Sequence, residues 1–227
     1  MTIRLSEFTK KVLNNIVDIN GGVIIKKTVN NKTLVTTTSA STSIALSVEL
    51  PEHFSYDVVI SELRRFLNIN DAFDDAELDF HSSHVVIKSD KNKAKIKYCY
   101  SDPRAVVSCQ GSPETGDEIV SVDISKEQLD KIKKQSNILQ LPHIQFAVED
   151  GAVVCIAKDC DNPSSNTITY DLGEANGIEI NEDVVVTAES LKVIPDDYQV
   201  TVCECAVKFN PLNNRTMTYV IARKAVY

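Results

Sequence analysis

Apolar residues recur at helical spacing in two stretches of the chain. The first covers Ser6–Ile16, where Phe8 and Val12 lead to Ile16 in steps of four, and the second covers Ser125–Lys134. Residues four apart share one face of an α-helix, so each stretch carries an apolar stripe that faces a core. In the second stretch, Ser125 with Gln128 three residues later predicts a capping box at the start of the helix.

Each predicted helix is followed by an apolar run, a short polar turn and a second apolar run. In the first half the runs are Gly22–Ile25 and Thr33–Val35, and in the second half Ile144–Val148 and Val153–Ile156. The turns, like the helix starts Ser6 and Ser125, lie 119 residues apart. Although residue identity between the halves is low, the order of elements predicts two copies of one unit. Such a repeat is typical of a ring or another pseudo-symmetric assembly.

A second short helix is expected in each half, at Ser61–Ile69 and at Thr187–Val193, with Ser61 and Thr187 as N-caps. Alternating or apolar runs predict further strands. These runs are Leu78–Phe80, His84–Lys88, Ala94–Tyr100, Val184–Val186, Tyr198–Phe209 and Met217–Ala225.

Glycine and proline are concentrated in the segment Gln110–Asp117, which is the best candidate for a linker. The boundaries predicted from it are an N-terminal domain over 1–110, a linker over 111–118 and a C-terminal domain over 119–227. Helices combined with antiparallel strands in each half place the chain in the α+β class.

The formal net charge of −8 argues against a simple electrostatic binder of nucleic acid. Charges of opposite sign are nevertheless separated along the chain. Acidic residues crowd between Asp71 and Asp79, which we interpret as a solvated surface because the segment lacks the glycine and the spacing of a calcium loop. Basic residues concentrate on the predicted helices, at Lys10, Lys11, Arg64, Arg65, Lys126, Lys131, Lys133, Lys134 and Lys192.

No motif supports catalysis, a cofactor or a metal site. The sequence has no Gly-x-Ser-x-Gly and no phosphate-binding loop, and its only close histidine pair, His81 and His84 beside Asp79, has no further ligand at a suitable spacing. The six cysteines form no Cys-x-x-Cys pair and are interpreted as reduced, small apolar residues of a cytoplasmic protein. Neither a membrane span nor a secretion signal is expected.

The helical lysines and arginines have two interpretations. Charged helix faces are usually just solvated, but here the feature recurs on corresponding helices of both halves in an otherwise acidic protein. That recurrence favours a surface that faces a polyanion. Since the helices show no Arg/Asn/Gln cluster suited to base edges, contact would be with phosphates and independent of sequence.

Several collinear patterns resemble the sliding clamps of T-even-type bacteriophages. The first runs from Leu5 to Lys26 and ends in Asn20-Gly-Gly-Val-Ile-Ile-Lys26. The others follow in order, and length and linker position also agree. They are Glu62-Leu-x-x-Phe-Leu67, Asp74-Asp-Ala-Glu77, Ile124-x-x-x-x-Leu129 and Ile138-x-x-x-x-x-Ile144.

The resemblance implies two tandem clamp-type domains, with helices on one face of curved antiparallel sheets, in a homotrimeric ring around duplex DNA. It implies a replicative DNA polymerase as partner, an ATP-driven clamp loader that opens the ring, and a location in the cytoplasm of an infected bacterial host. The basic residues above would face DNA. Partner peptides would bind near the linker and the last strand, at Tyr219, Val220, Ile221 and Ala222. The alternative is a non-enzymatic structural or scaffold phage protein of repeated β-rich domains, which would have no reason to concentrate lysines on helices.

Overall fold

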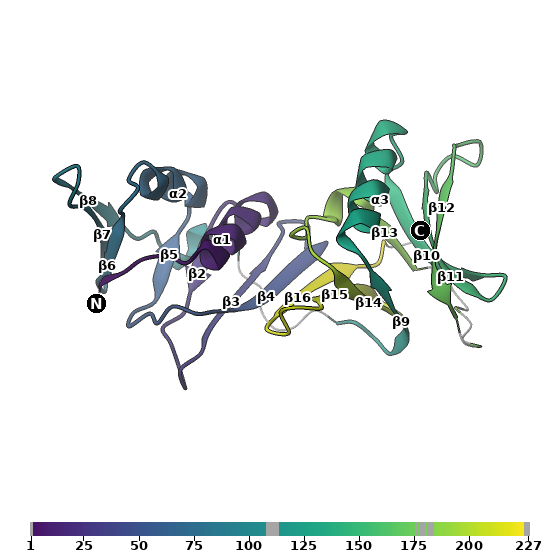
Figure 1. Cartoon of the computed structure of the whole chain (residues 1–227), viewed down its shortest axis with the longest axis horizontal. Coiled ribbons are helices and arrows are strands. Elements are labelled where there is room, and N and C mark those ends of the chain that lie inside the picture. Colours follow the sequence, from purple (N-terminus) through teal and green to yellow (C-terminus); the bar gives the residue numbers. More distant parts are fainter. Residues whose placement is uncertain (1, 108–113, 176, 178–179, 181–183, 225–227) are drawn as a thin grey trace. The chain divides into compact units, whose positions relative to one another are not determined.

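The chain folds into two compact units in the computed structural model, which describes residues 2–107, 114–175, 177, 180 and 184–224 (Figure 1). Unit 1 comprises Met1–Ala40 and Ala45–Gln110, and unit 2 comprises Ser41–Ile44 and Gly111–Tyr227. Of the predicted linker, residues 111–113 lie outside the described residues, and residues 114–117 form no helix or strand.

Unit 1 contains two α-helices and three groups of antiparallel strands. One sheet has the order β1-β6-β7-β8, while β2 pairs with β5 and β3 with β4. The bounds are β1 (Thr2–Ile3), α1 (Glu7–Ile19), β2 (Val23–Ile25), β3 (Thr33–Thr38), β4 (Ile44–Leu50), β5 (Val58–Ile60), α2 (Leu63–Asp71), β6 (Glu77–Phe80), β7 (His84–Ser89), β8 (Ala94–Cys99) and the 3-10 turn η1 (Pro103–Ala105).

Unit 2 has one α-helix and two groups of antiparallel strands. The orders are β12-β11-β10-β13 and β16-β15-β14-β9. The bounds are β9 (Glu118–Ile124), α3 (Lys126–Ile138), β10 (His143–Glu149), β11 (Ala152–Lys158), β12 (Ile168–Glu174), β13 (Val184–Thr187), the 3-10 turn η2 (Ala188–Ser190), β14 (Tyr198–Cys203), β15 (Ala206–Pro211) and β16 (Met217–Ala222).

Helix α1 begins where the sequence predicts, because Ser6 caps it. The Ser6 Oγ accepts the Thr9 N–H at 3.1 Å. The carboxylate of Glu52 adds a second cap, since it accepts the Ser6 N–H at 2.7 Å and the Thr9 hydroxyl at 2.5 Å. A negative charge there also complements the positive end of the helix dipole.

The predicted capping box of α3 is confirmed. The Ser125 Oγ accepts the Gln128 N–H at 3.2 Å, and the Gln128 Oε1 accepts the Ser125 N–H at 3.0 Å. Two of the donors that a helix start leaves without intrahelical partners are satisfied in this way.

The predicted N-cap of α2 is wrong. The helix begins two residues after Ser61, Glu62 stands at the cap position without a side-chain bond, and the Ser61 hydroxyl lies 2.7 Å from the Ser101 hydroxyl. A tertiary partner therefore holds the serine side chain that would otherwise have capped the helix.

The second helix of the C-terminal half is reduced to η2, a single 3-10 turn over Ala188–Ser190. Beyond it, Leu191, Val193 and Ile194 are all buried, which requires an irregular path through the core. Pro195 further disfavours the helical conformation at the residue before it. The prediction of a helix over Thr187–Val193 is corrected accordingly.

The repeat also differs in how the apolar runs pair. In unit 2 the two runs after α3 form the hairpin β10–β11, whereas in unit 1 the corresponding β2 and β3 pair with β5 and β4 instead. The pair β2–β5 corresponds to the pair β10–β13, so one strand pairing is shared by the two units.

The predicted strand Tyr198–Phe209 is two strands, β14 and β15, joined at Glu204 and Cys205. The N–H groups of these two turn residues donate to Asp117 O and Thr115 O. The turn contains no glycine, proline, asparagine or aspartate, which is why the sequence pattern missed it.

We predict that Gly22→Ala destabilises the protein whereas Gly21→Ala does not. A Cβ at Gly22 would lie 2.8 Å from Ile60 O and 2.9 Å from Val106 Cγ2, while one at Gly21 would meet no atom within 4 Å. Because a backbone oxygen cannot move aside cheaply, Gly22→Ala should lower the free energy of unfolding by about 1–3 kcal/mol. Urea unfolding of both variants measures this, and equal stabilities would contradict it.

Candidate functional site

The outward face of α3 carries the most basic surface among the three described helices. The helix contains four lysines and two carboxylates, Glu127 and Asp130. Leu129, Ile132 and Ser136 are buried against unit 2, so with 3.6 residues per turn the opposite side belongs to Lys131 and Lys134. Both lysines are exposed.

The other two predicted lysines of α3 lie nearer the buried stripe. Lys126 is exposed at the first turn, where its N–H donates to the Asp197 carboxylate at 2.8 Å. Lys133 is half-buried, and burial lowers the pKa of its ammonium. Of the four, Lys131 and Lys134 are therefore the two best placed to meet a ligand opposite the core.

In unit 1, helices α1 and α2 lie side by side and carry Lys10, Lys11, Arg64 and Arg65 (Figure 1). Three of these cations form exposed ion pairs. Lys10 Nζ is 2.9 Å from Glu7, Arg64 is 3.3 Å from Asp18 on the neighbouring helix, and Arg65 is 3.0 Å from Glu62. For Lys11 the part of the chain that is described holds no ion pair within 4.0 Å. Unit 1 thus presents basic side chains that nearby carboxylates largely neutralise.

The structure places Lys192 differently from the prediction. It follows η2 instead of lying on a helix, and it is half-buried. Its N–H donates to Ser190 O at 2.8 Å. The prediction that Lys192 lies on a helix is therefore wrong, while its contact with DNA stays a prediction.

The predicted partner-peptide residues alternate along β16. Tyr219 and Ile221 are fully buried, and the Tyr219 hydroxyl accepts the Ile194 N–H at 3.3 Å. Val220 is half-buried and Ala222 exposed. In this conformation only Val220 and Ala222 can touch a partner, and the pocket itself stays a prediction.

Among the described cysteines, only Cys155 and Cys203 are buried, as the sequence interpretation expects, and burial raises the pKa of the Cys155 thiol to about 12. Cys99, Cys160 and Cys205 are exposed, which corrects that interpretation, and Cys109 lies outside the described residues. The His81 and His84 rings stack at 4.6 Å in the β6–β7 turn.

Sequence reasoning missed a polar cluster around the buried His143 at the start of β10. Its Nδ1 accepts the Cys160 N–H at 3.1 Å, and its Nε2 lies 2.9 Å from the ammonium of Lys224. That ammonium also donates to both oxygens of Asp161, at 3.1 and 2.9 Å. His143, Asp159 and Asp161 could group around a metal ion, but Lys224 already supplies a cation there. Lys224 lies 63 positions from Asp161 and 81 from His143, so no local motif signals the cluster.

Burial, followed by the charge of Lys224, lowers the pKa of His143. We predict that stability falls as the pH drops below about 6.5, the usual value for histidine, because the unfolded state then takes up the proton first. The loss should reach at most about 1.4 kcal/mol per pH unit. Urea unfolding between pH 5 and 8 measures it. His143→Gln should flatten this slope, whereas His53→Gln, at an exposed histidine, should keep it; equal slopes in all three proteins would contradict the assignment.

No helix within the described ranges is long and apolar enough to cross a membrane.

The sequence is similar to those of phage replication proteins. A family model described as "gp45 sliding clamp, C terminal" matches residues 121–225. The sliding clamp of Vibrio phage KVP40 is 26% identical over 205 residues, which cover 88% of this chain and 90% of that protein. The sliding clamp of Escherichia phage RB69 is 24% identical over 231 residues, covering 98% and 97%.

The fold is shared with clamps from cellular organisms. The A. fulgidus PCNA, solved with the C-terminal region of FEN-1 bound, superimposes with a TM-score of 0.76 at 14% identity, covering 100% of this chain and 99% of that one. The H. pylori beta clamp gives a TM-score of 0.72 at 15% identity, covering 99% of this chain and 66% of that one. Taken with the collinear motifs, these matches show a DNA sliding clamp, a processivity factor of a DNA polymerase, that is similar over nearly its whole length to the sliding clamps of T-even-type bacteriophages.

Proposed function

We propose that this clamp is a non-enzymatic homotrimer that an ATP-driven loader closes around duplex DNA, with α3 as its main contact to the DNA backbone. The observation that carries the proposal is the exposed basic face of α3 in an acidic chain. A ring holds DNA by topology, so it needs only weak contacts that tolerate sliding. An acidic exterior would repel other nucleic acid, while the lysines of the lining would attract phosphates.

The contribution of unit 1 to DNA binding is expected to be smaller. Arg64 and Arg65 would have to leave Asp18 and Glu62 before they could bind phosphate. Exposed pairs of this kind are weak, about 0–1 kcal/mol each, so the arginines can exchange partners, but the carboxylates remain beside the DNA path. Lys11, on the outward side of α1, lacks such a neighbour within the described ion pairs.

Closure of the ring requires two surfaces of one chain that fit each other head to tail. Strand β8 ends one sheet and strand β12 ends another, so both have an edge that a neighbouring subunit could extend. Lys95 and Lys97 are exposed on β8, and Asp171 and Glu174 are exposed on β12. Opposite charges on two open edges favour the pairing of β8 with β12 over the pairing of either strand with its own copy.

We predict that Lys131→Glu combined with Lys134→Glu impairs processive synthesis without changing the oligomer. Reversing two charges opposite the core removes phosphate attraction and adds repulsion, so primer-extension products should shorten several-fold, and more at raised salt. The matched control is Lys27→Glu with Lys91→Glu, at exposed lysines off the helices. Product lengths equal to those of the control would exclude Lys131 and Lys134 from the DNA-facing set.

We also predict that Lys95→Glu combined with Lys97→Glu lowers the solution mass measured by light scattering after size exclusion. Placing acidic side chains on β8 opposite Asp171 and Glu174 should open the ring through repulsion of like charges. Adding Asp171→Lys and Glu174→Lys to the same chain should restore the mass. A mass that stays at the wild-type value in the first variant would argue against this pairing of edges.

A further inference from the structure

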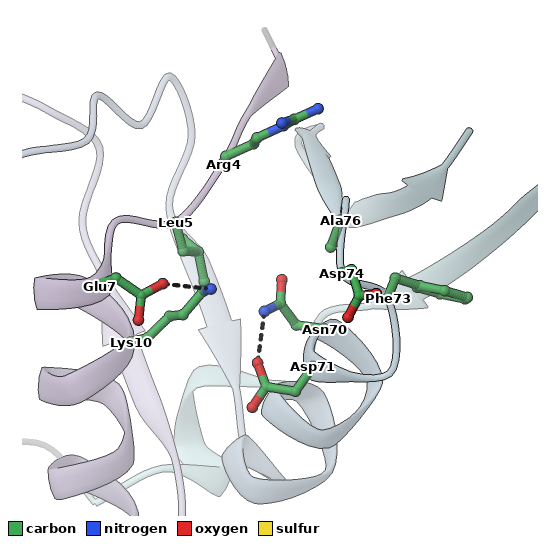
Figure 2. A pocket seen from close by; sticks show the side chains of 9 residues that line it. All are labelled: Arg4, Leu5, Glu7, Lys10, Asn70, Asp71, Phe73, Asp74 and Ala76. Carbon is green, nitrogen blue, oxygen red and sulfur yellow. Dashed lines mark hydrogen bonds and ion pairs between the residues drawn. The ribbon is translucent and has the colours of Figure 1, made fainter. Parts of the chain in front are cut away.

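A pocket of about 410 Å³ lies in unit 1 between the start of α1 and the end of α2 (Figure 2). Part of its wall is apolar, from Leu5, Phe73 and Ala76, and the rest is polar. Its volume falls within the range typical of small-molecule and side-chain sites. Neither the clamp fold nor contact with DNA requires such a pocket, which raises the question of what it binds.

Asn70 supplies a buried acceptor that points into this pocket. The residue is only 3% exposed, and its Nδ2 donates to the Asp71 Oδ1 at 3.1 Å. A carboxylate can only accept a hydrogen bond, so this contact fixes which way round the amide lies. The Asn70 Oδ1 is then turned into the pocket, as Figure 2 shows, and it accepts no hydrogen bond from any described residue.

Two carboxylates beside this acceptor are also without a cation. Asp71 and Asp74 line the pocket, both are exposed, and neither forms an ion pair with another described residue. The basic side chains nearby are already bound: Lys10 to Glu7 at 2.9 Å and Arg4 to Glu77 at 2.8 Å. In Figure 2 the Arg4 side chain is directed away from Asn70 and Asp74. Arg4 and Lys10 also line the pocket, but each is paired with a glutamate, so Asp71 and Asp74 are left without an ion pair among the described residues.

The spacing of the acceptors in this pocket favours a guanidinium over a single metal ion. Among the described residues, no three carboxylate or imidazole groups of this pocket bring their ligand atoms within 4.8 Å of one another, in contrast to the group around His143. Separated acceptors suit a guanidinium, which has five N–H donors in a planar fork, with its methylene stem lying along the apolar wall. A phosphate would be repelled by Asp71 and Asp74, so nucleic acid is not the ligand here.

We infer that this pocket, formed by Asn70, Asp71 and Asp74 with the apolar wall of Leu5, Phe73 and Ala76, receives an arginine side chain of a partner protein. The guanidinium bonds to the Asn70 Oδ1 and to the two carboxylates. The inference does not depend on which helices contact DNA. It gives the clamp a second docking surface of opposite charge to the basic face of α3.

The test uses the full-length protein and N-acetyl-L-arginine amide as the probe, with saturation-transfer NMR as the measurement. N-acetyl-L-citrulline amide has nearly the same shape without the charge and serves as the ligand control. Arginine amide should bind saturably and citrulline amide about tenfold more weakly, since charge-assisted hydrogen bonds are roughly twice as strong as neutral ones. Equal signals from the two ligands, or no saturable binding of arginine amide, would overturn the inference.

The location is tested with Asp71→Asn combined with Asp74→Asn, against Asp90→Asn as the matched control at an exposed carboxylate in the β7–β8 turn. The double variant should weaken arginine binding about tenfold, as expected for the loss of two charged acceptors, while the control should leave it unchanged. All three aspartates are exposed, so melting temperatures should stay close to the wild type. Equal affinities in the double variant and wild type, or full displacement of the ligand by millimolar Mg²⁺, would contradict an arginine pocket.

Discussion

The burial of one stripe on each helix is the constraint on which the functional surface depends. Leu129 and Ile132 of α3 are buried in unit 2, as Val12, Leu13 and Ile16 of α1 are in unit 1. Each such side chain contributes about 1.5–3 kcal/mol when it leaves water, so a helix cannot rotate about its axis without a large loss of stability. Since the stripe fixes the orientation of the helix, it also fixes which lysines reach solvent. In this chain the core decides which charges of the helices are exposed to solvent, and therefore which would meet DNA in the proposed ring.

Both units carry basic residues on their helices, but the charges beside those residues differ. Helix α3 carries four lysines and only two carboxylates. In unit 1, by contrast, Arg64 and Arg65 form ion pairs with Asp18 and Glu62. A clamp must hold a polyanion loosely enough to slide. Salt at ordinary concentration screens exposed charges over a Debye length of about 8–10 Å, so exposed lysines attract phosphates only weakly. Under the proposed function, basic residues that are partly neutralised in one unit and available in the other would bind DNA with intermediate strength, which suits retention by topology better than tight binding would.

Local patterns in the sequence predicted the starts of α1 and α3, most strands and the α+β class, because Ser6, Ser125 and Gln128 act within one helical turn. The errors arose where distant residues decide. Ser61 bonds to Ser101 instead of capping α2, and the turn at Glu204–Cys205 donates its N–H groups to the segment before β9. The basic helix faces could be listed from the sequence, but the ion pair between Asp18 and Arg64 could not, since these residues lie 46 positions apart. The His143 cluster and the pocket at Asn70 were invisible for the same reason.

The central claim is that this chain holds DNA by enclosing it. The most direct test loads the protein onto nicked circular DNA with its clamp loader and ATP, isolates the complex by gel filtration, and then cuts the circle with a restriction enzyme at one site. A closed ring should stay with the intact circle through the column at raised salt and should be released when the DNA becomes linear, because it slides off the ends. Protein that remains bound to the linear product, or that leaves the circle as readily as the cut DNA, would contradict topological binding.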